Sequence, residues 1–156
     1  MLLWRIVKNR HAAAAFDGEG ARRFGGRWNS VGTPMVYCST TLSLAALEIL
    51  VHMEVMDLGI SRVSIQVDVP TDIPLPQVKL QDLPSHWRSI PAPLELAFLG
   101  DQWVQREESL LLAVPSAIIP QENNILLNPR HSNFHRLIFR DPEPFLLDPC
   151  LLKSNP

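Results

Sequence analysis

The 156 residues of the chain include 46% hydrophobic and 19% charged residues, an ordinary globular composition that predicts one domain over residues 1–156. The formal net charge of −2 argues against a protein that binds nucleic acid directly through bulk positive charge. No stretch reaches the roughly eighteen uncharged apolar residues of a membrane span, and the short, charged N-terminal run is not typical of a signal peptide, so we expect a cytoplasmic protein without membrane contact.

Three short segments in the first half of the chain are rich in β-branched or aromatic residues and predict strands over residues 2–7, 34–39 and 61–70. The third is the clearest, because hydrophobic and polar residues alternate along it. Its apolar positions are Val63, Ile65, Val67 and Val69. A glycine-rich segment, residues 17–33, lies between the first two strands and is predicted to be a loop; we call it the glycine loop.

A helix of about three turns is predicted within residues 40–59, where a Ser/Thr cluster can cap the start and Gly59 can end it. Its apolar stripe at helical spacing consists of Leu44, Leu47 and Val51. The same spacing predicts that Glu48 and His52, four residues apart, share one face of the helix.

The second half of the chain begins with a proline-rich segment, residues 71–93, which is predicted to be a surface excursion. A second helix follows over residues 92–108, with an apolar side predicted to be Leu94, Phe98 and either Trp103 or Val104. Apolar runs within residues 109–120, 123–129 and 144–152 predict strands with tight turns. This order predicts an α+β fold with a mixed, mainly antiparallel sheet flanked by helices.

The glycine loop combines glycines with arginines, namely Gly20, Gly25, Gly26 and Gly32 with Arg22, Arg23 and Arg27. Glycines permit positive φ and the close approach of a ligand, and arginine binds phosphate or carboxylate through two parallel donors. Residues 1–30 carry six basic against two acidic residues, a net charge of +4. The loop is therefore either a turn with solvated arginines or a site for a small anion. It is not a dinucleotide fingerprint, which requires Gly-x-Gly-x-x-Gly between a strand and a helix.

Several single polar residues have both a structural and a functional interpretation. Glu48 lies either at the solvent boundary of its helix or in a cleft, and Tyr37 is either a core residue or an aromatic platform for a ring. Ser116 is a turn serine or a ligand-orienting hydroxyl, and it lacks the Gly-x-Ser-x-Gly elbow of a serine hydrolase. Asn124 and Asn128 are turn asparagines or amide donors to a ligand.

The two cysteines, Cys38 and Cys150, have neither the spacing of metal ligands nor the density of a disulfide framework. We therefore expect two buried thiols in a reducing compartment, and no metal site.

Five segments in chain order carry a resemblance to a known family: WRI, GARRFGGRWNSVGTPMVYCSTTLSLAALE, LGDQWV, LLLAVPSAIIPQENNILLNPRHSNF and PFLLDPCLL. Together they resemble the RES domain, the toxin half of bacterial RES–Xre toxin–antitoxin pairs. The resemblance runs from about Arg5 to Leu151, and GGRWN, LAALE and VPS are its most specific parts. HSNF stands where members commonly have His-Pro-x-Phe, and Cys150 where they often have arginine.

The resemblance implies a fold related to ADP-ribosyltransferases and an enzyme that consumes NAD+ as its substrate, without a redox cofactor. The arginine, glutamate and serine of the family name correspond to Arg27, Glu48 and Ser116, and Tyr37 is a fourth catalytic candidate. The substrate-binding candidates are Arg5, Gly25, Gly26, His52, Asn124 and Asn128.

The implied reaction gives each candidate a physical role. Cleavage of the nicotinamide–ribose bond passes through an oxocarbenium-like state that a carboxylate stabilises, which suits Glu48. Arg27 and the glycine loop suit the pyrophosphate, whereas Tyr37 can stack on nicotinamide and Ser116 can orient the ribose or the acceptor. Whether the acceptor is water, phosphate or a protein side chain stays open.

The resemblance also implies a partner, a cognate Xre-like helix-turn-helix antitoxin, and a homodimer is a further possible assembly. The alternative function is a non-catalytic nucleotide-binding module that regulates a partner. Loss of Glu48 or Arg27 would favour that alternative, and both residues are present.

Overall fold

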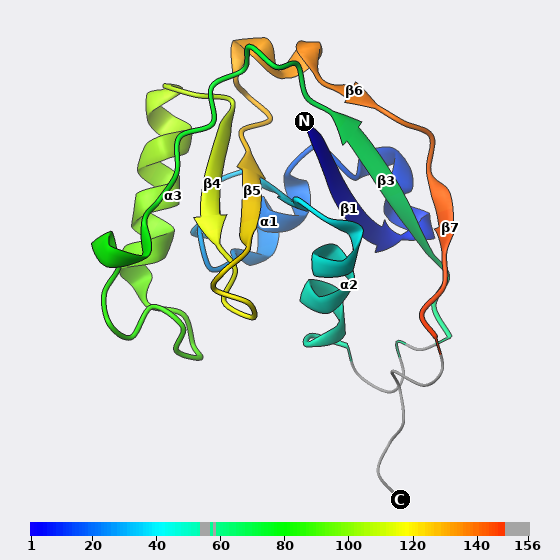
Figure 1. Cartoon of the computed structure of the whole chain (residues 1–156), viewed down its shortest axis with the longest axis horizontal. Helices are drawn as coiled ribbons and strands as arrows, with labels where there is room; N and C mark the ends of the chain where they lie inside the picture. The colour runs from blue at the N-terminus through cyan, green and yellow to red at the C-terminus, as the bar shows by residue number, and fades with distance from the viewer. Residues whose placement is uncertain (54–56, 58, 149–156) are drawn as a thin grey trace, which may run out of the picture.

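The computed structural model describes residues 1–53, 57 and 59–148, and within them seven strands form one sheet (Figure 1). The strand order is β4-β5-β2-β1-β3-β6, and β7 also pairs with β3. The strands are β1 (Leu2–Lys8), β2 (Val36–Ser39), β3 (Arg62–Asp68), β4 (Leu111–Pro115), β5 (Asn123–Leu127), β6 (Ile138–Phe139) and β7 (Glu143–Phe145). Their pairings are antiparallel. The predicted α+β fold is confirmed.

The helices of the described residues are α1 (Glu19–Phe24), α2 (Leu42–Leu50) and α3 (Leu94–Arg106), with short 3-10 turns at Asn9–Ala14, Leu80–Asp82 and Ser132–Arg136. None of these helices has the length and apolar character needed to cross a membrane. Thr41 caps α2, because its side chain accepts a hydrogen bond from the backbone N–H of Leu44 at 3.1 Å.

The end of α2 differs from the prediction. The helix ends at Leu50 rather than at Gly59, because the backbone N–H groups of His52 and Met53 bond to carbonyls three residues earlier and tighten the chain into a turn. Val51 is consequently exposed rather than part of a buried stripe.

The sheet is nearly divided between β1 and β2. β1 pairs with β3 over seven residues, whereas β1 and β2 share the single pair Trp4 and Ser39. The sheet therefore has two halves, β4-β5-β2 on one side and β1-β3 with β6 and β7 on the other. Helix α2 packs against both β1 and β2 and covers this junction (Figure 1).

Apolar side chains cover both faces of the sheet. One layer is built on Leu3, Val36, Val67, Ile125 and Leu127, with Phe16 and Phe134 packed against it. The other is built on Leu112, Val114 and Leu126, which pack with Trp28, Trp87 and Trp103 beneath α3. The apolar stripe predicted for β3, from Val63 to Val69, is buried throughout, so that prediction is confirmed. Burial also raises the pKa of the Cys38 thiol to about 12, whereas Cys150 lies outside the described residues.

The buried face of α3 is not the predicted one. Leu94 and Phe98 are 71% and 57% exposed, although Trp103 and Val104 are buried as expected. The reason is Gly100, where an added Cβ would lie 1.8 Å from the carbonyl oxygen of Trp28. The absence of a side chain lets the glycine loop approach the helix here, and this contact selects the face that contains residue 100.

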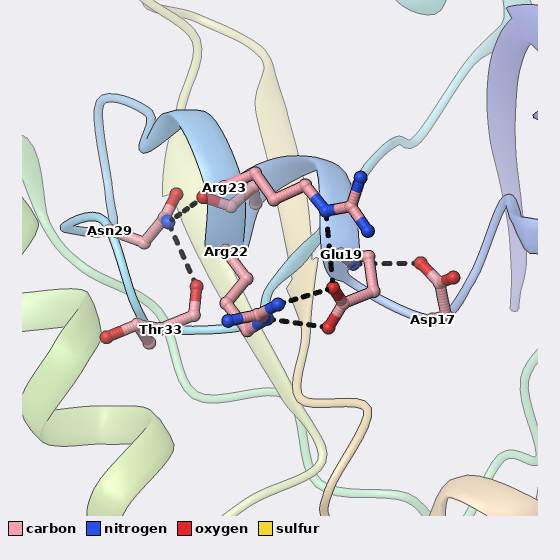
Figure 2. A network of polar contacts seen from close by, with 7 residues as sticks. Asp17, Glu19, Arg22, Arg23, Asn29 and Thr33 are labelled. Carbon is pink, nitrogen blue, oxygen red and sulfur yellow. Dashed lines mark hydrogen bonds and ion pairs between the residues drawn. The ribbon is translucent and has the colours of Figure 1, made fainter.

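The glycine loop contains a helix, α1, although the whole segment was predicted to be a loop. Figure 2 shows how its polar side chains pair: Asp17 accepts a bond from the backbone N–H of Glu19 at 2.8 Å, and Glu19 accepts two from Arg22 at 2.7 and 2.8 Å. Arg23 also lies 3.6 Å from Glu19. The arginines hold the pKa of the Glu19 carboxyl below its usual range, Arg22 most strongly. Two of the three arginines expected to face an anion therefore pair with the loop's own carboxylate.

Candidate active site

The carboxylate of Glu48 is held by two side chains from the β4-β5-β2 half of the sheet. Ser116, which follows β4, donates its hydroxyl hydrogen to Glu48 Oε1 at 2.8 Å. Asn124, on β5, donates from Nδ2 to the same oxygen at 2.5 Å. Among the described residues both bonds go to Oε1 and none goes to Oε2. The structure thus brings together Glu48, Ser116 and Asn124, with one carboxylate oxygen left for another partner.

A second layer of bonds fixes these two donors. Ser116 is fully buried, and its oxygen accepts the backbone N–H groups of Ile118 and Ile119, each at 3.1 Å. Asn124 Oδ1 accepts the hydroxyl of Ser39 at 2.7 Å, because register places these two residues opposite each other on β2 and β5. Ser39 was not among the predicted residues, although alternation from Tyr37 along the same strand places the two on one face.

Arg27 lies near this carboxylate and is held by the proline-rich segment. Its NH1 group donates to the carbonyl of Trp87 at 2.5 Å and to that of Ser89 at 3.4 Å. Partial burial lowers the pKa of the Arg27 guanidinium, and the negative charge of Glu48 opposes that shift. No carboxylate in the described part of the chain forms an ion pair with Arg27. Its charge is therefore not neutralised by an ion pair there, although it lies close enough to Glu48 for the two charges to interact.

Tyr37 shapes the glycine loop through its hydroxyl. That hydroxyl donates to Asn29 Oδ1 at 2.8 Å and accepts the backbone N–H of Trp28 at 3.1 Å. The amide nitrogen of Asn29 in turn donates to three carbonyls of the loop, including that of Thr33 at 3.0 Å (Figure 2). Burial raises the pKa of Tyr37, so the hydroxyl stays protonated and keeps both bonds.

The two predicted glycines are required by this packing. A Cβ on Gly26 would lie 2.6 Å from the Tyr37 hydroxyl and 2.9 Å from Asn29 Oδ1, so the backbone can approach the tyrosine only without a side chain. Gly25 has a φ of +70°, which other residues rarely adopt. Both glycines position Arg27 by fixing the chain immediately before it.

Three predicted substrate-binding residues lie apart from the cluster. Trp4 pairs with Ser39, so the next residue, Arg5, projects from the opposite face of the sheet. There Arg5 NH1 donates to the carbonyl of Tyr37 at 2.6 Å, and burial lowers the pKa of the guanidinium. Asn128 is fully buried and donates to the Val104 carbonyl at 3.1 Å, which ties β5 to α3.

His52 is the third of these residues. It lies beyond the end of α2 and is exposed, so the prediction that it shares a helical face with Glu48 is wrong. The helix would have had to continue for another half-turn to align the two side chains.

Arg88 was not predicted, yet it lies at the site. Its Nε donates to the carbonyl of Ala117 at 2.8 Å, one residue after Ser116. No sequence signal indicated this role, because the proline-rich segment lacks any periodicity that would fix the direction of its side chains.

Two cavities in the described part of the chain lie away from the Glu48 cluster. One of about 680 Å³ lies between α3 and residues 74–76, and one of about 320 Å³ lies over β1 and β3. Neither is lined by Glu48, Arg27 or Ser116. We assign the site by its convergent polar groups rather than by cavity size, because chemistry depends on positioned charges and donors. No group of three His, Cys, Asp or Glu residues suited to a metal ion occurs in the same part of the chain.

Comparison with known proteins matches the RES domain family model to residues 2–148. A protein of Yersinia enterocolitica serotype O:8, named Toxin Res, is 40% identical over 152 residues, which cover 97% of this chain and 99% of that protein. One of Sphingobium sp. strain YBL2, named Prs ADP-ribosylating toxin, is 35% identical over 156 residues, covering 97% and 96%. A solved chain of the M. tuberculosis MbcT–MbcA toxin–antitoxin complex has the same fold, with a TM-score of 0.73 at 18% identity over 93% of this chain and 84% of that one.

Proposed function

Because the chain belongs to the RES domain family, we propose that it is a bacterial toxin enzyme that cleaves the nicotinamide–ribose bond of NAD+. Relatives over nearly the whole length are named toxins, and one of them is named as ADP-ribosylating. ADP-ribosylation consumes NAD+ by breaking that bond, so the name of this relative supports the proposal that cleavage of the same bond is the first step here.

The observation that carries the proposal is the Glu48 carboxylate, fixed by Ser116 and Asn124 through one oxygen. In the reaction, the bond between ribose C1′ and the pyridinium nitrogen breaks, and its electron pair leaves with neutral nicotinamide. The ribose becomes an oxocarbenium-like cation, which a preorganised anion stabilises. Glu48 Oε2 would face that cation or hold a ribose hydroxyl, and a nucleophile would then bond to C1′.

The other residues have positioning roles in this proposal. Ser116 is no nucleophile, because its hydroxyl hydrogen is donated to Glu48 and its oxygen already accepts two N–H groups. Arg27, set by Gly25 and Gly26, would bind the pyrophosphate. Tyr37 would keep the loop in shape while its ring borders the nicotinamide.

The test is release of free nicotinamide from NAD+ by the purified protein, with and without inorganic phosphate, which also identifies the acceptor. Glu48→Gln keeps the shape of the side chain but removes its charge, so we expect at least a hundredfold lower rate. Glu95→Gln, on the exposed side of α3, is the matched control and should retain the wild-type rate. A Glu48→Gln rate within about threefold of wild type would exclude the proposed role. NAD+ binding without turnover by the wild type would instead favour a nucleotide-binding module.

An antitoxin partner is part of the proposal. The structurally similar chain comes from a toxin–antitoxin complex, and an enzyme that depletes NAD+ would harm its own cell unless it is held inactive. We expect an Xre-like helix-turn-helix antitoxin whose acidic groups complement the +4 charge of residues 1–30. Co-expression with the adjacent reading frame should restore growth and yield a complex with little NAD+ turnover, and growth arrest that persists despite complex formation would contradict this.

A further inference from the structure

The proline-rich segment is anchored beside the candidate site by Trp87. This side chain is 8% exposed and packs with Trp28 and Trp103 in the apolar layer beneath α3. Bonds from the Trp87 N–H to the Pro84 carbonyl and from the Ser89 N–H to the His86 carbonyl, both 2.9 Å, shape the chain around it into turns. Because the tryptophan points into the core, the next residue, Arg88, lies at the surface in a defined place.

Two guanidinium groups meet at this anchor. Arg27 donates to the carbonyls of Trp87 and Ser89, which are the residues on either side of Arg88. Arg88 donates from Nε to the carbonyl of Ala117, next to Ser116. The segment therefore connects the glycine loop with the turn that orients Glu48, and it places a second arginine between them.

Neither guanidinium is neutralised by the protein. In the part of the chain that the structure describes, their hydrogen-bond partners are neutral carbonyls, and no carboxylate forms an ion pair with them. Arg22, Arg136 and Arg140, in contrast, each pair with an aspartate or glutamate. Burial is the main cause of the lowered pKa of Arg27, and the positive charge of Arg88 adds to it, so the two guanidinium groups are close enough to repel each other. An anion with several oxygens would relieve that repulsion.

We propose that Arg88 is a substrate-binding residue that acts with Arg27 to hold phosphoryl oxygens at this site. The Nε bond to Ala117 fixes the plane of the guanidinium, and its NH1 and NH2 groups have no partner among the described residues. Such a planar pair of donors suits a phosphoryl group better than an ammonium does. The inference rests on the proposed function, under which the phosphoryl oxygens belong either to the pyrophosphate of NAD+ or to a free phosphate that acts as acceptor.

The test compares wild type with Arg88→Ala, Arg88→Lys and the control Arg130→Ala. Arg130 is also exposed, but it follows the opposite end of β5 from Asn124. Calorimetry measures the affinity of each protein for ADP-ribose, which keeps the pyrophosphate and lacks the scissile bond, and separately for inorganic phosphate. NAD+ kinetics are measured in parallel, and melting temperatures confirm that each variant is folded.

Arg88→Ala should lower the affinity for one of these two ligands about tenfold or more, as expected for loss of a charge-assisted hydrogen bond. Weaker ADP-ribose binding with a raised KM assigns Arg88 to the pyrophosphate, and weaker phosphate binding alone assigns it to the acceptor. Arg88→Lys should recover part of the loss, because it keeps the charge but not the two parallel donors.

If the wild type cleaves NAD+ and Arg88→Ala binds both ligands as tightly as the wild type does, the assignment of Arg88 is overturned and the proposed function stands. A wild type that neither binds ADP-ribose nor cleaves NAD+ would overturn the proposed function itself. Should Arg88→Ala be unfolded, Arg88→Gln provides the same comparison with a side chain of similar length.

Discussion

Replacing Ser116 by alanine removes both roles of this buried hydroxyl, which are to orient Glu48 and to stabilise the turn after β4. The variant loses the bond that Ser116 donates to Glu48 at 2.8 Å, and the N–H groups of Ile118 and Ile119 lose their acceptor. Glu48 keeps the bond from Asn124 at 2.5 Å, so its carboxylate remains at the site but can rotate. We expect a folded protein with reduced activity.

The magnitude follows from these bonds. A hydrogen bond to a charged group contributes about 1.5–3 kcal/mol. The two N–H groups belong to half-buried residues, so water replaces part of their lost bonding and adds a cost of only about 1 kcal/mol. The sum of roughly 2.5–4 kcal/mol is smaller than the 5–15 kcal/mol by which typical domains are stable. Because a freed carboxylate is less often in the reactive orientation, NAD+ cleavage should fall about 10- to 100-fold.

Ser109→Ala is the matched control, since Ser109 is also a buried serine but lies just before the start of β4, whereas Ser116 follows its end. It accepts the indole N–H of Trp103 at 2.8 Å and donates to the Leu111 carbonyl at 2.9 Å, far from Glu48 along the strand. Urea unfolding should show a comparable loss of stability for both variants, whereas nicotinamide release should fall only for Ser116→Ala. Equal activities per folded molecule would show that Ser116 serves the turn alone and would refute its role in orienting Glu48.

Two further predictions concern stability. Gly100→Ala should destabilise the protein by about 3 kcal/mol or more in urea unfolding, because its Cβ would overlap the Trp28 carbonyl. The control Gly20→Ala, with open space around it in α1, should be neutral or stabilising. Equal stabilities of the two variants would contradict the close contact at Gly100. Stability should also fall as pH rises above about 9, because the folded state raises the pKa of Cys38 from 9.0 to about 12 and also raises that of Tyr37. The unfolded chain then binds fewer protons than the folded one, with a slope of about 1.4 kcal/mol per pH unit for each group. Cys38→Ala should flatten the curve between pH 9 and 10, and an unchanged curve would count against a buried thiol.

Periodicity predicted β3 because apolar and polar residues alternate along its sequence, and its valines and isoleucine are buried as that pattern requires. It failed for α3, where a single glycine contact rather than the most apolar stripe selects the buried face. It also missed α1, whose six residues are stabilised by pairing within the loop and not by an apolar side.

The site was predictable only in part. Glu48 and Ser116 were named through a family resemblance, and the structure shows them in contact. Arg5 was named as a substrate-binding candidate without a predicted direction, because the face it projects from depends on the register of β1 against β2, which no local pattern encodes. The position of His52 was predicted wrongly because α2 ends two residues before it. The position of Arg88 depends on how Trp87 anchors the proline-rich segment.

The bonds to Glu48 also bear on when activity can arise during synthesis. Its two donors lie 68 and 76 positions further along the chain, and Asn124 is itself fixed by a serine 85 positions before it. Contacts of such separation form late in folding. At about 5–20 residues per second, a ribosome needs roughly 4–15 s to extend the chain from Glu48 to Asn124. A nascent chain would therefore hold Arg27, Tyr37 and Glu48 without the groups that orient the carboxylate, and any NAD+ cleavage would have to wait for the completed sheet.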